Sequence, residues 1–242
     1  MNFLSTILDI IFPVKCLFCG ERGIELCARC LIDSPSAERK NDKWIFPLYD
    51  YRHPPIKKAI LALKYKNKKR IANIFGETMY SRILEELGDL SIMENFHEPI
   101  LIPIPLSRER IMERGYNQAE LICREIVKIQ NSSKNLAPPL APLSLSRRGA
   151  GGEASISNEA FTLLTNVLIK PKDTEHQAHI EDRATRLKNI IGSFAIKNPE
   201  KIKGRNIILI DDVITTGATL TEAKKTLKRA GARKVIAFTV AH

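Results

Sequence analysis

The stretch of residues 207–220, IILIDDVITTGATL, constrains the fold of this chain more than any other segment. Its first four residues are apolar and mostly β-branched, which is typical of a strand buried on both faces of a parallel sheet. Two acids, Asp211 and Asp212, follow where that strand should end. Apolar residues then recur three and four apart over 220–230, which predicts a helix with one buried face. A further apolar run at 235–240 predicts another strand.

The turn between the acids and the helix suits an anion. Unpaired backbone N–H groups and the positive end of the helix dipole point into such a turn. Gly217 lets the backbone approach a ligand, and the threonine hydroxyls can donate to phosphate oxygens. The turn has no lysine, so it is not the phosphate loop of nucleotide hydrolases. Adjacent carboxylates would repel a polyphosphate but accept hydrogen bonds from a vicinal diol, so the pattern predicts a site for a phosphorylated pentose.

The string IDDVITTGATL resembles the signature with which type I phosphoribosyltransferases bind phosphoribosyl pyrophosphate (PRPP). The resemblance implies that Asp211 and Asp212 are catalytic acids that hold the ribose diol. It also implies that the 5′-phosphate is bound by the residues after them, which are Val213, Ile214, Thr215, Thr216, Gly217, Ala218 and Thr219. The alternative is structural: the acids would then only cap a helix that follows a buried strand.

Four cysteines near the start of the chain have the spacing C-x2-C-x7-C-x2-C: Cys16, Cys19, Cys27 and Cys30. Each CxxC pair aims two thiolates at one point, and two such pairs complete a tetrahedral zinc site. Four sulfur ligands leave no open position, so the expected zinc is structural. A pair of disulfides is the alternative, and a reducing compartment argues against it. A fifth cysteine, Cys123, falls on the apolar stripe of a predicted helix, as a buried core thiol would.

A second predicted strand, at 100–102, also ends in polar and charged residues. It closes on Pro-Ile-Pro, and guanidinium groups follow at Arg108 and Arg110. Guanidinium groups bind diphosphate oxygens in a forked geometry, and open α/β sheets bind ligands where their strands end. We therefore add both arginines to the predicted PRPP site. Upstream, we expect an edge strand within 44–51, interrupted by Pro47, and helices at 56–65 and 71–87.

Four blocks in this order are similar to the ComF family of competence-associated phosphoribosyltransferase-like proteins: CLFCG with LCARC, LIPIPLSRERIMERGYNQAEL, TEHQAHIEDRATRLKNIIGSF and the PRPP motif. The resemblance implies a type I fold, an N-terminal zinc element and a role linked to uptake of transforming DNA. It also implies a lid over the reaction centre, with the candidates Thr174, Gln177, Arg183 and Asn189. The chain departs from the family pattern at 131–159, which is rich in Pro, Ser, Gly and Ala and predicts a disordered insertion. Phe161 opens a segment, 161–169, that we expect to resume as a strand.

The formal net charge of +11 favours anionic partners, either phosphorylated metabolites or nucleic acid. The densest basic group is KYKNKKR, residues 64–70. It is either a solvated face or a nucleic-acid contact, for which the candidates are Lys64, Tyr65, Lys66, Lys68, Lys69 and Arg70. The apolar segment at 1–15 lacks the features of a secretory signal, and no run is long enough to cross a bilayer. We expect a cytoplasmic protein whose first residues pack as an amphipathic helix or contact a partner.

The sequence therefore predicts an α/β protein of the type I phosphoribosyltransferase class, a Rossmann-like parallel sheet with helices on both faces. A helix and zinc-binding clip at 1–45 would precede the main domain at 46–242. The leading function is binding of PRPP with magnesium, and transfer of the phosphoribosyl group to a nitrogenous base. The alternatives are a non-catalytic protein that binds PRPP or single-stranded DNA, and a scaffold that docks on a helicase-like protein of the uptake machinery.

Overall fold

The computed structural model describes residues 13–37, 43–135, 161–171 and 192–242. Its helices are α2 (Ala28–Ile32), α3 (Pro54–Tyr65), α4 (Ile71–Glu94), α5 (Arg108–Arg114), α6 (Gln118–Asn135), the 3₁₀ helix η1 (Pro199–Lys201) and α8 (Ala218–Arg229). Its strands are β1 (Ile45–Tyr49), β2 (Ile100–Pro103), β3 (Thr162–Leu163), β4 (Leu168–Ile169), β5 (Ala195–Ile196), β6 (Asn206–Val213) and β7 (Lys234–Ala241).

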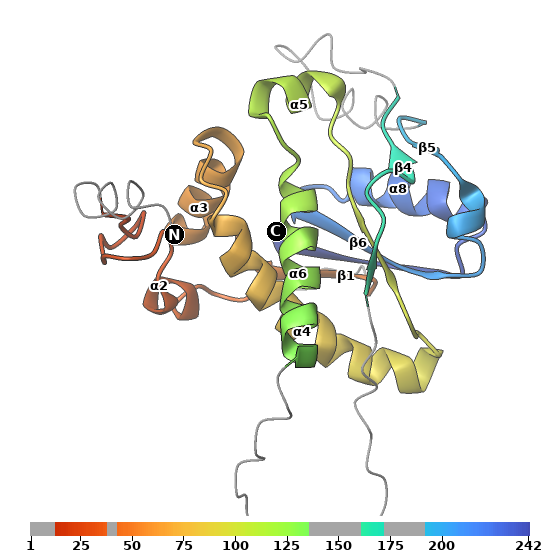
Figure 1. Ribbon diagram of the computed structural model, residues 1–242, viewed down its shortest axis with the longest axis horizontal. Helices are drawn as coiled ribbons and strands as arrows, with labels where there is room; N and C mark the ends of the chain where they lie inside the picture. The colour runs from red at the N-terminus through yellow and green to blue at the C-terminus, as the bar shows by residue number, and fades with distance from the viewer. Residues whose placement is uncertain (1–12, 38–42, 136–160, 172–191) are drawn as a thin grey trace, which may run out of the picture.

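The core of the fold is a five-stranded sheet in the order β1-β7-β6-β2-β3, in which every neighbouring pair is parallel (Figure 1). The strand with Pro47 lies at one edge, where a residue without an N–H costs no ladder hydrogen bond. A separate antiparallel pair is formed by β4 and β5. The parallel sheet with its helices confirms the predicted fold class.

Both faces of the sheet are covered, as the unbroken apolar run in β6 requires. Ile208 and Ile210 face a core shared with α3, α4 and α6, whereas Ile207 and Leu209 face a second core shared with α8. In Figure 1, α4 and α6 pass in front of the sheet. Side chains of successive strand residues point to opposite faces, so a strand between two helical layers needs apolar residues at every position.

The connections that follow the adjacent strands β2 and β6 lead to opposite sides of the sheet. From β2 the chain runs through α6 to β3, on one side, and from β6 it runs through α8 to β7, on the other. Because α6 and α8 also lie against opposite faces, the connections that follow the carboxyl ends of β2 and β6 diverge. In open α/β sheets such a switch point forms the crevice in which ligands bind.

The structure corrects several predicted boundaries. The segment 161–169 is not one strand: its residues form β3 and β4, in different sheets, with bends at 165–167 between them. Strand β6 continues through both acids to Val213, and α4 extends to Glu94. Helix α6 runs to Asn135, so the first five residues of the predicted insertion are helical. The rest of that insertion, the lid candidates and the predicted N-terminal helix lie outside the described residues.

None of the helices in the described ranges is long and apolar enough to cross a membrane.

Candidate functional site

The two acids lie at the carboxyl end of β6, at the switch point between β6 and β2 where a ligand crevice is expected. Pro103 of β2 is in register with Ile210, and the Ile104 N–H donates to the Ile210 carbonyl over 2.9 Å. Asp211 and Asp212 are therefore the next residues beyond the last paired position of β2. The Asp212 N–H donates to Oδ1 of Asp211 over 2.8 Å, which fixes the first side chain beside the strand.

Lys64, the penultimate residue of α3, reaches this acid pair. Its Nζ lies 2.8 Å from Oδ1 of Asp212, and the two side chains are 18% and 11% exposed. Lys64 is also one of the nucleic-acid candidates of the basic segment, and the structure places its ammonium group at the acid pair. Loss of either partner of an ion pair this shielded from water would leave a poorly solvated charge without its counterion.

The acids differ in their electrostatic surroundings. Burial raises the pKa of Asp211 to about 7, and the negative charge of Asp212 adds to this effect. The Asp212 N–H, Lys64 and Arg110 act in the opposite direction and lower the pKa of Asp211. The free protein therefore holds the Lys64–Asp212 ion pair beside a carboxyl group whose burial favours the protonated form.

The turn after β6 leads directly to the N-terminus of α8. Gly217 has φ 76°, in the left-handed region that glycine adopts without strain, and its carbonyl accepts the Thr221 N–H over 2.9 Å. Thr215 and Thr216, the two residues before Gly217, are exposed. The positive end of a 12-residue helix thus lies next to the acids, with the exposed hydroxyls of Thr215 and Thr216 beside it. The Thr216 hydroxyl oxygen also accepts the Ala218 N–H over 3.4 Å. A helix N-terminus with hydroxyl side chains suits a phosphate group.

On the β2 side, the chain passes from Ile104 into α5, a helix that the sequence analysis did not predict. The Ser107 side chain caps it by accepting the Arg110 N–H over 3.4 Å. Arg108 and Arg110 are both exposed on the first turn, and the charge of Arg110 lowers the pKa of Asp211. The structure therefore brings one of the two predicted arginines into electrostatic contact with the acid pair.

The segment after α5 holds the end of α3 in place. The Tyr116 hydroxyl donates to the carbonyl of Leu63. Arg114 donates to the Tyr65 hydroxyl over 3.3 Å, and its guanidinium carbon lies 5.1 Å from the centre of that ring. Residues on both sides of Lys64 are thus bound by the connection between β2 and α6.

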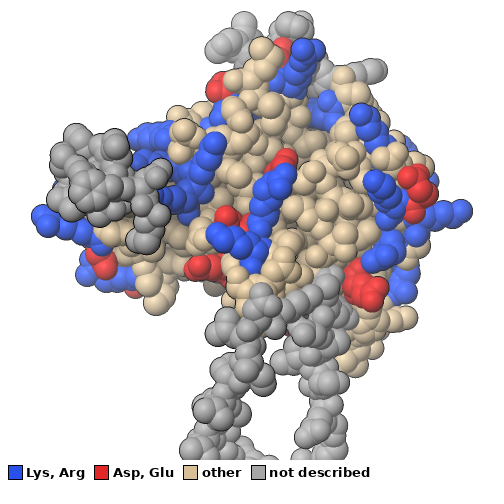
Figure 2. Space-filling model, in the orientation of Figure 1, with Lys and Arg blue, Asp and Glu red and all other residues tan. Residues whose placement is uncertain are grey.

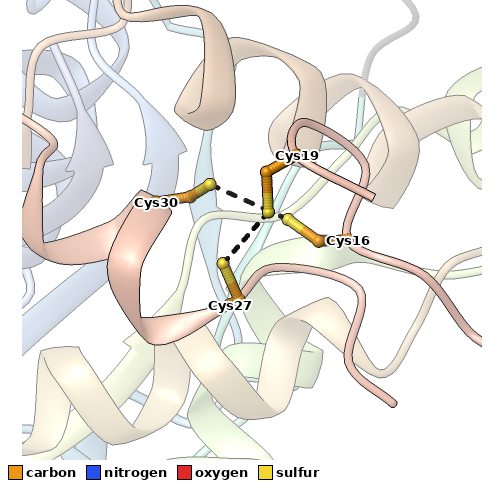
Figure 3. A group of neighbouring side chains, drawn as sticks. All are labelled: Cys16, Cys19, Cys27 and Cys30. Carbon is orange, nitrogen blue, oxygen red and sulfur yellow. Dashed lines mark hydrogen bonds between the residues drawn. The ribbon is translucent and has the colours of Figure 1, made fainter. Parts of the chain in front are cut away.

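The four predicted zinc ligands form one cluster (Figure 3). Their sulfur atoms all lie within 4.8 Å of one another. Two of the separations are 3.9 Å, between Cys16 and Cys30, and 3.5 Å, between Cys19 and Cys27. A tetrahedron with metal–sulfur bonds of ~2.3 Å has edges of about 3.8 Å, so the thiols fit a four-sulfur zinc site.

The described cysteines are all free thiols, so the structure favours the zinc site over the alternative of two disulfides. Burial raises the pKa of Cys16, but the backbone N–H groups of Cys19, Cys27 and Phe18 outweigh it and bring the pKa to about 6. The first CxxC turn is thus preorganised for a thiolate, the form that binds metal. Cys123 is fully buried in α6, as predicted for a core thiol.

Comparison with known proteins identifies the family. The family model described as "Phosphoribosyl transferase domain" matches residues 146–242. Over 90% of its length the chain is 27% identical to Competence protein F of Haemophilus influenzae, covering 81% of that protein. It is 31% identical to Competence protein ComFC of Bacillus subtilis, covering 76% of this chain and 59% of that one. DNA utilization protein YhgH of Escherichia coli (strain K12) is 25% identical over 86% of this chain and 74% of the relative.

The chain belongs to the ComF family. Its fold is that of the type I phosphoribosyltransferases, an assignment that rests on the parallel sheet and the matching domain model. Among solved structures, the hypoxanthine phosphoribosyltransferase of Trypanosoma cruzi aligns with a TM-score of 0.37 and 8% identity, covering 69% of this chain and 64% of that one. A similarity this low adds nothing to the assignment.

The basic segment 64–70 of this ComF protein does not form one uniform surface. Lys64 points to the acids, Lys68 pairs with Glu25 over 3.7 Å, and Lys69 lies 4.7 Å above the ring of Tyr116. Lys66 and Arg70 are exposed. In Figure 2, Lys and Arg side chains gather over the region of α3.

Lys64 lies beside the acid pair although it is outside the signature that follows β6. A signal was present in the periodicity of α3, where Ile56, Ile60 and Leu63 are all fully buried. Lys64 is four residues after Ile60, so it lies on the buried stripe. A lysine on the inner face of a helix needs a partner of opposite charge. The dense run of basic residues around Lys64 made its inward position hard to recognise from the sequence.

Proposed function

We propose that this ComF protein binds PRPP with magnesium in the crevice between β2 and β6 and transfers its phosphoribosyl group to a nitrogenous base, with release of pyrophosphate. One observation carries the proposal: an acid pair and a helix N-terminus lie side by side at the switch point of the sheet. A phosphorylated sugar with a free diol matches both halves of this arrangement.

Each part of the crevice would act on a different part of the substrate. The carboxylates of Asp211 and Asp212 accept hydrogen bonds from the ribose hydroxyls and stabilise positive charge that develops on the ring. The N-terminus of α8, with Thr215, Thr216 and Gly217, binds the 5′-phosphate. Arg110 from α5, with Arg108 beside it, stabilises the leaving pyrophosphate. Catalysis of this kind depends on positioning and electrostatics.

Magnesium fits the site as a companion of the diphosphate. The carboxylate of Asp212 is already paired with Lys64, so the acids do not form a cage of free oxygen ligands. Mg²⁺ prefers octahedral oxygen coordination and commonly keeps several waters beside substrate phosphates. When bound it would neutralise charge on the diphosphate. The thiols of Cys16, Cys19, Cys27 and Cys30 would hold structural zinc, far from this chemistry in the sequence.

A role in DNA utilisation is the second part of the proposal, and the names of the relatives motivate it. The exposed Lys66 and Arg70 would contact the phosphates of single-stranded DNA. Tyr65 and Tyr116 each already have a cation against one ring face, which leaves less aromatic surface for stacking a base. Binding would then be mainly electrostatic and independent of sequence. A helicase-like partner stays an expectation from the family resemblance.

Calorimetry with PRPP and magnesium tests the first part, followed by an assay for pyrophosphate release with candidate bases. Wild type should bind, and Gly217→Val should not, because a branched side chain would occupy the phosphate position. Gly204→Val is the matched control, since Gly204 has a similar φ of 72° and open space around it away from the crevice. Wild-type protein that neither binds PRPP nor releases pyrophosphate with any base would contradict the proposal.

A further inference from the structure

The end of α3 is held more firmly than the end of a surface helix needs to be. Three consecutive residues each contact an element distant in the sequence. The Leu63 carbonyl accepts from Tyr116, Lys64 pairs with Asp212, and Tyr65 is stacked and hydrogen-bonded by Arg114. Two of these contacts come from the connection after β2 and the third from β6, so both strands that border the crevice fix the position of Lys64.

The connection after β2 is itself anchored at the crevice. The side-chain amide of Asn117 donates to the Ile104 carbonyl over 2.9 Å, and its oxygen caps α6 by accepting the Ala119 N–H over 3.0 Å. Asn117 is buried. The segment that holds Lys64 is thereby fastened to the end of β2, next to the acids.

Three charged neighbours change the pKa of Asp211. Asp212, on the same strand, adds negative charge, whereas Lys64 from α3 and Arg110 from α5 add positive charge. Lys64 makes the close contact, at 2.8 Å from Asp212. Without it, two adjacent carboxylates would repel each other in a poorly solvated place, and one would take up a proton.

We infer that Lys64 is a positioning residue of the phosphosugar site, which holds Asp212 as an ionised, fixed acceptor for a ribose hydroxyl. The inference rests on the proposed function and extends it to a residue outside the signature. A protonated carboxyl group has lost part of its acceptor capacity, so the ion pair keeps the site ready for a diol. An ammonium group has three donors, and those not used by Asp212 are available to the bound ligand.

The test compares three variants by calorimetry with PRPP and magnesium. Lys64→Gln should weaken binding roughly tenfold or more near pH 7, as expected for the loss of ~1.4 kcal/mol or more. Part of that loss should be regained near pH 9, where both acids ionise without help. Lys64→Arg keeps the charge and should bind more tightly than Lys64→Gln. Lys57→Gln, a change at an exposed residue two turns earlier on α3, should bind within about twofold of wild type.

A measurement on the ligand-free protein separates this inference from the proposed function. The ¹³C signal of the Asp211 carboxyl group should titrate at higher pH in Lys64→Gln than in wild type, because Lys64 lowers the pKa of Asp211. If wild type fails to bind PRPP, the proposed function is wrong. The titration then decides alone. A higher pKa of Asp211 in Lys64→Gln supports the inference that Lys64 fixes the charge state of the acids, and an unchanged pKa overturns it.

Two other outcomes would overturn the inference even if wild type binds PRPP. One is unchanged affinity of Lys64→Gln at every pH. The other is an equal loss at every pH with an unaltered Asp211 titration, since a purely structural role gives that result.

Discussion

The Nζ of Lys68 lies 3.7 Å from Oε1 of Glu25, so the loop after α3 is joined to the cysteine clip. Glu25 is buried between the two CxxC pairs, and its side chain is only 7% exposed. At the other end of α3, His53 Nδ1 lies 3.0 Å from the hydroxyl of Ser34, which also donates to the Cys30 carbonyl. The clip therefore braces both ends of the helix that carries Lys64.

The first prediction concerns the zinc content of the protein and the effect of removing one zinc ligand. Protein purified without added zinc should contain about one equivalent by metal analysis, as expected for one four-sulfur site. Cys27→Ser should lose the metal and destabilise the N-terminal part of the chain. PRPP affinity should change little, because Tyr116 and Arg114 still hold the end of α3.

Cys123→Ala is the matched control for that experiment. It removes a thiol that is buried in α6, outside the cluster, so the zinc content should stay at about one equivalent. Purified protein with two disulfides and no metal would refute the zinc assignment.

The second prediction concerns single-stranded DNA. If residues 66–70 contact its backbone, the affinity should fall steeply with salt, because each neutralised phosphate releases counterions. Changing Lys66, Lys68, Lys69 and Arg70 to Gln should flatten that slope in a fluorescence titration over several salt concentrations.

The control changes the same number and kind of charges on η1, α8 and their surroundings: Lys197, Lys201, Lys225 and Arg229 to Gln. All four of these residues are exposed. An equal slope for both quadruple variants would mean that residues 66–70 are a solvated face and contact no DNA.

The fold was predictable where apolar periodicity is strong. The buried run in β6, the stripe of α8 and the edge position of Pro47 follow from spacing and from the missing proline N–H. Helix α5 was not predictable in this way, because none of its residues is buried. The last turn of α4 likewise exposes Ile92 and Met93, so its apolar residues do not mark one face.

The candidate site shows a similar division. The acids, the turn and the cysteine cluster lie in short contiguous motifs, so residue type and spacing identify them. The partner of Lys64 is far along the chain, and only the tertiary structure brings Asp212 to it. The division of 161–169 into β3 and β4 depends on which strands they pair with, and no local pattern specifies that.

The third prediction concerns pH and Asp211. Its pKa in the folded protein is about 7, above its ordinary value of 3.8, so the folded state binds the extra proton between these pH values. That contribution to stability is present at low pH and is lost as pH rises through about 7. Asp211→Asn is neutral throughout and should be more stable than wild type at about pH 8, by on the order of 1.4 kcal/mol for each pKa unit by which folding raises Asp211, and should lose this advantage below about pH 4. Chemical denaturation across this range measures it.

Asp212→Asn should lower the stability of the folded protein near pH 5, where Asp211 is protonated and does not repel Asp212. Loss of the ion pair leaves Lys64 without its carboxylate, which should cost roughly 1–3 kcal/mol. Two substitutions that shift stability in the same direction and by the same amount would contradict the different roles of the acids.

The assignment of the crevice to a phosphosugar is tested most directly by the affinity for PRPP of the variants in which Asp211, Asp212 or both are changed to Asn. Calorimetry at about pH 8 with magnesium avoids protonation of Asp211, and circular dichroism checks the fold. Each substitution keeps the size of the side chain but removes charge-assisted hydrogen bonds of ~1.5–3 kcal/mol. The affinity should fall roughly ten- to hundredfold for each change. If the folded double variant binds PRPP as tightly as wild type, the acids only cap a helix and the phosphosugar assignment is wrong.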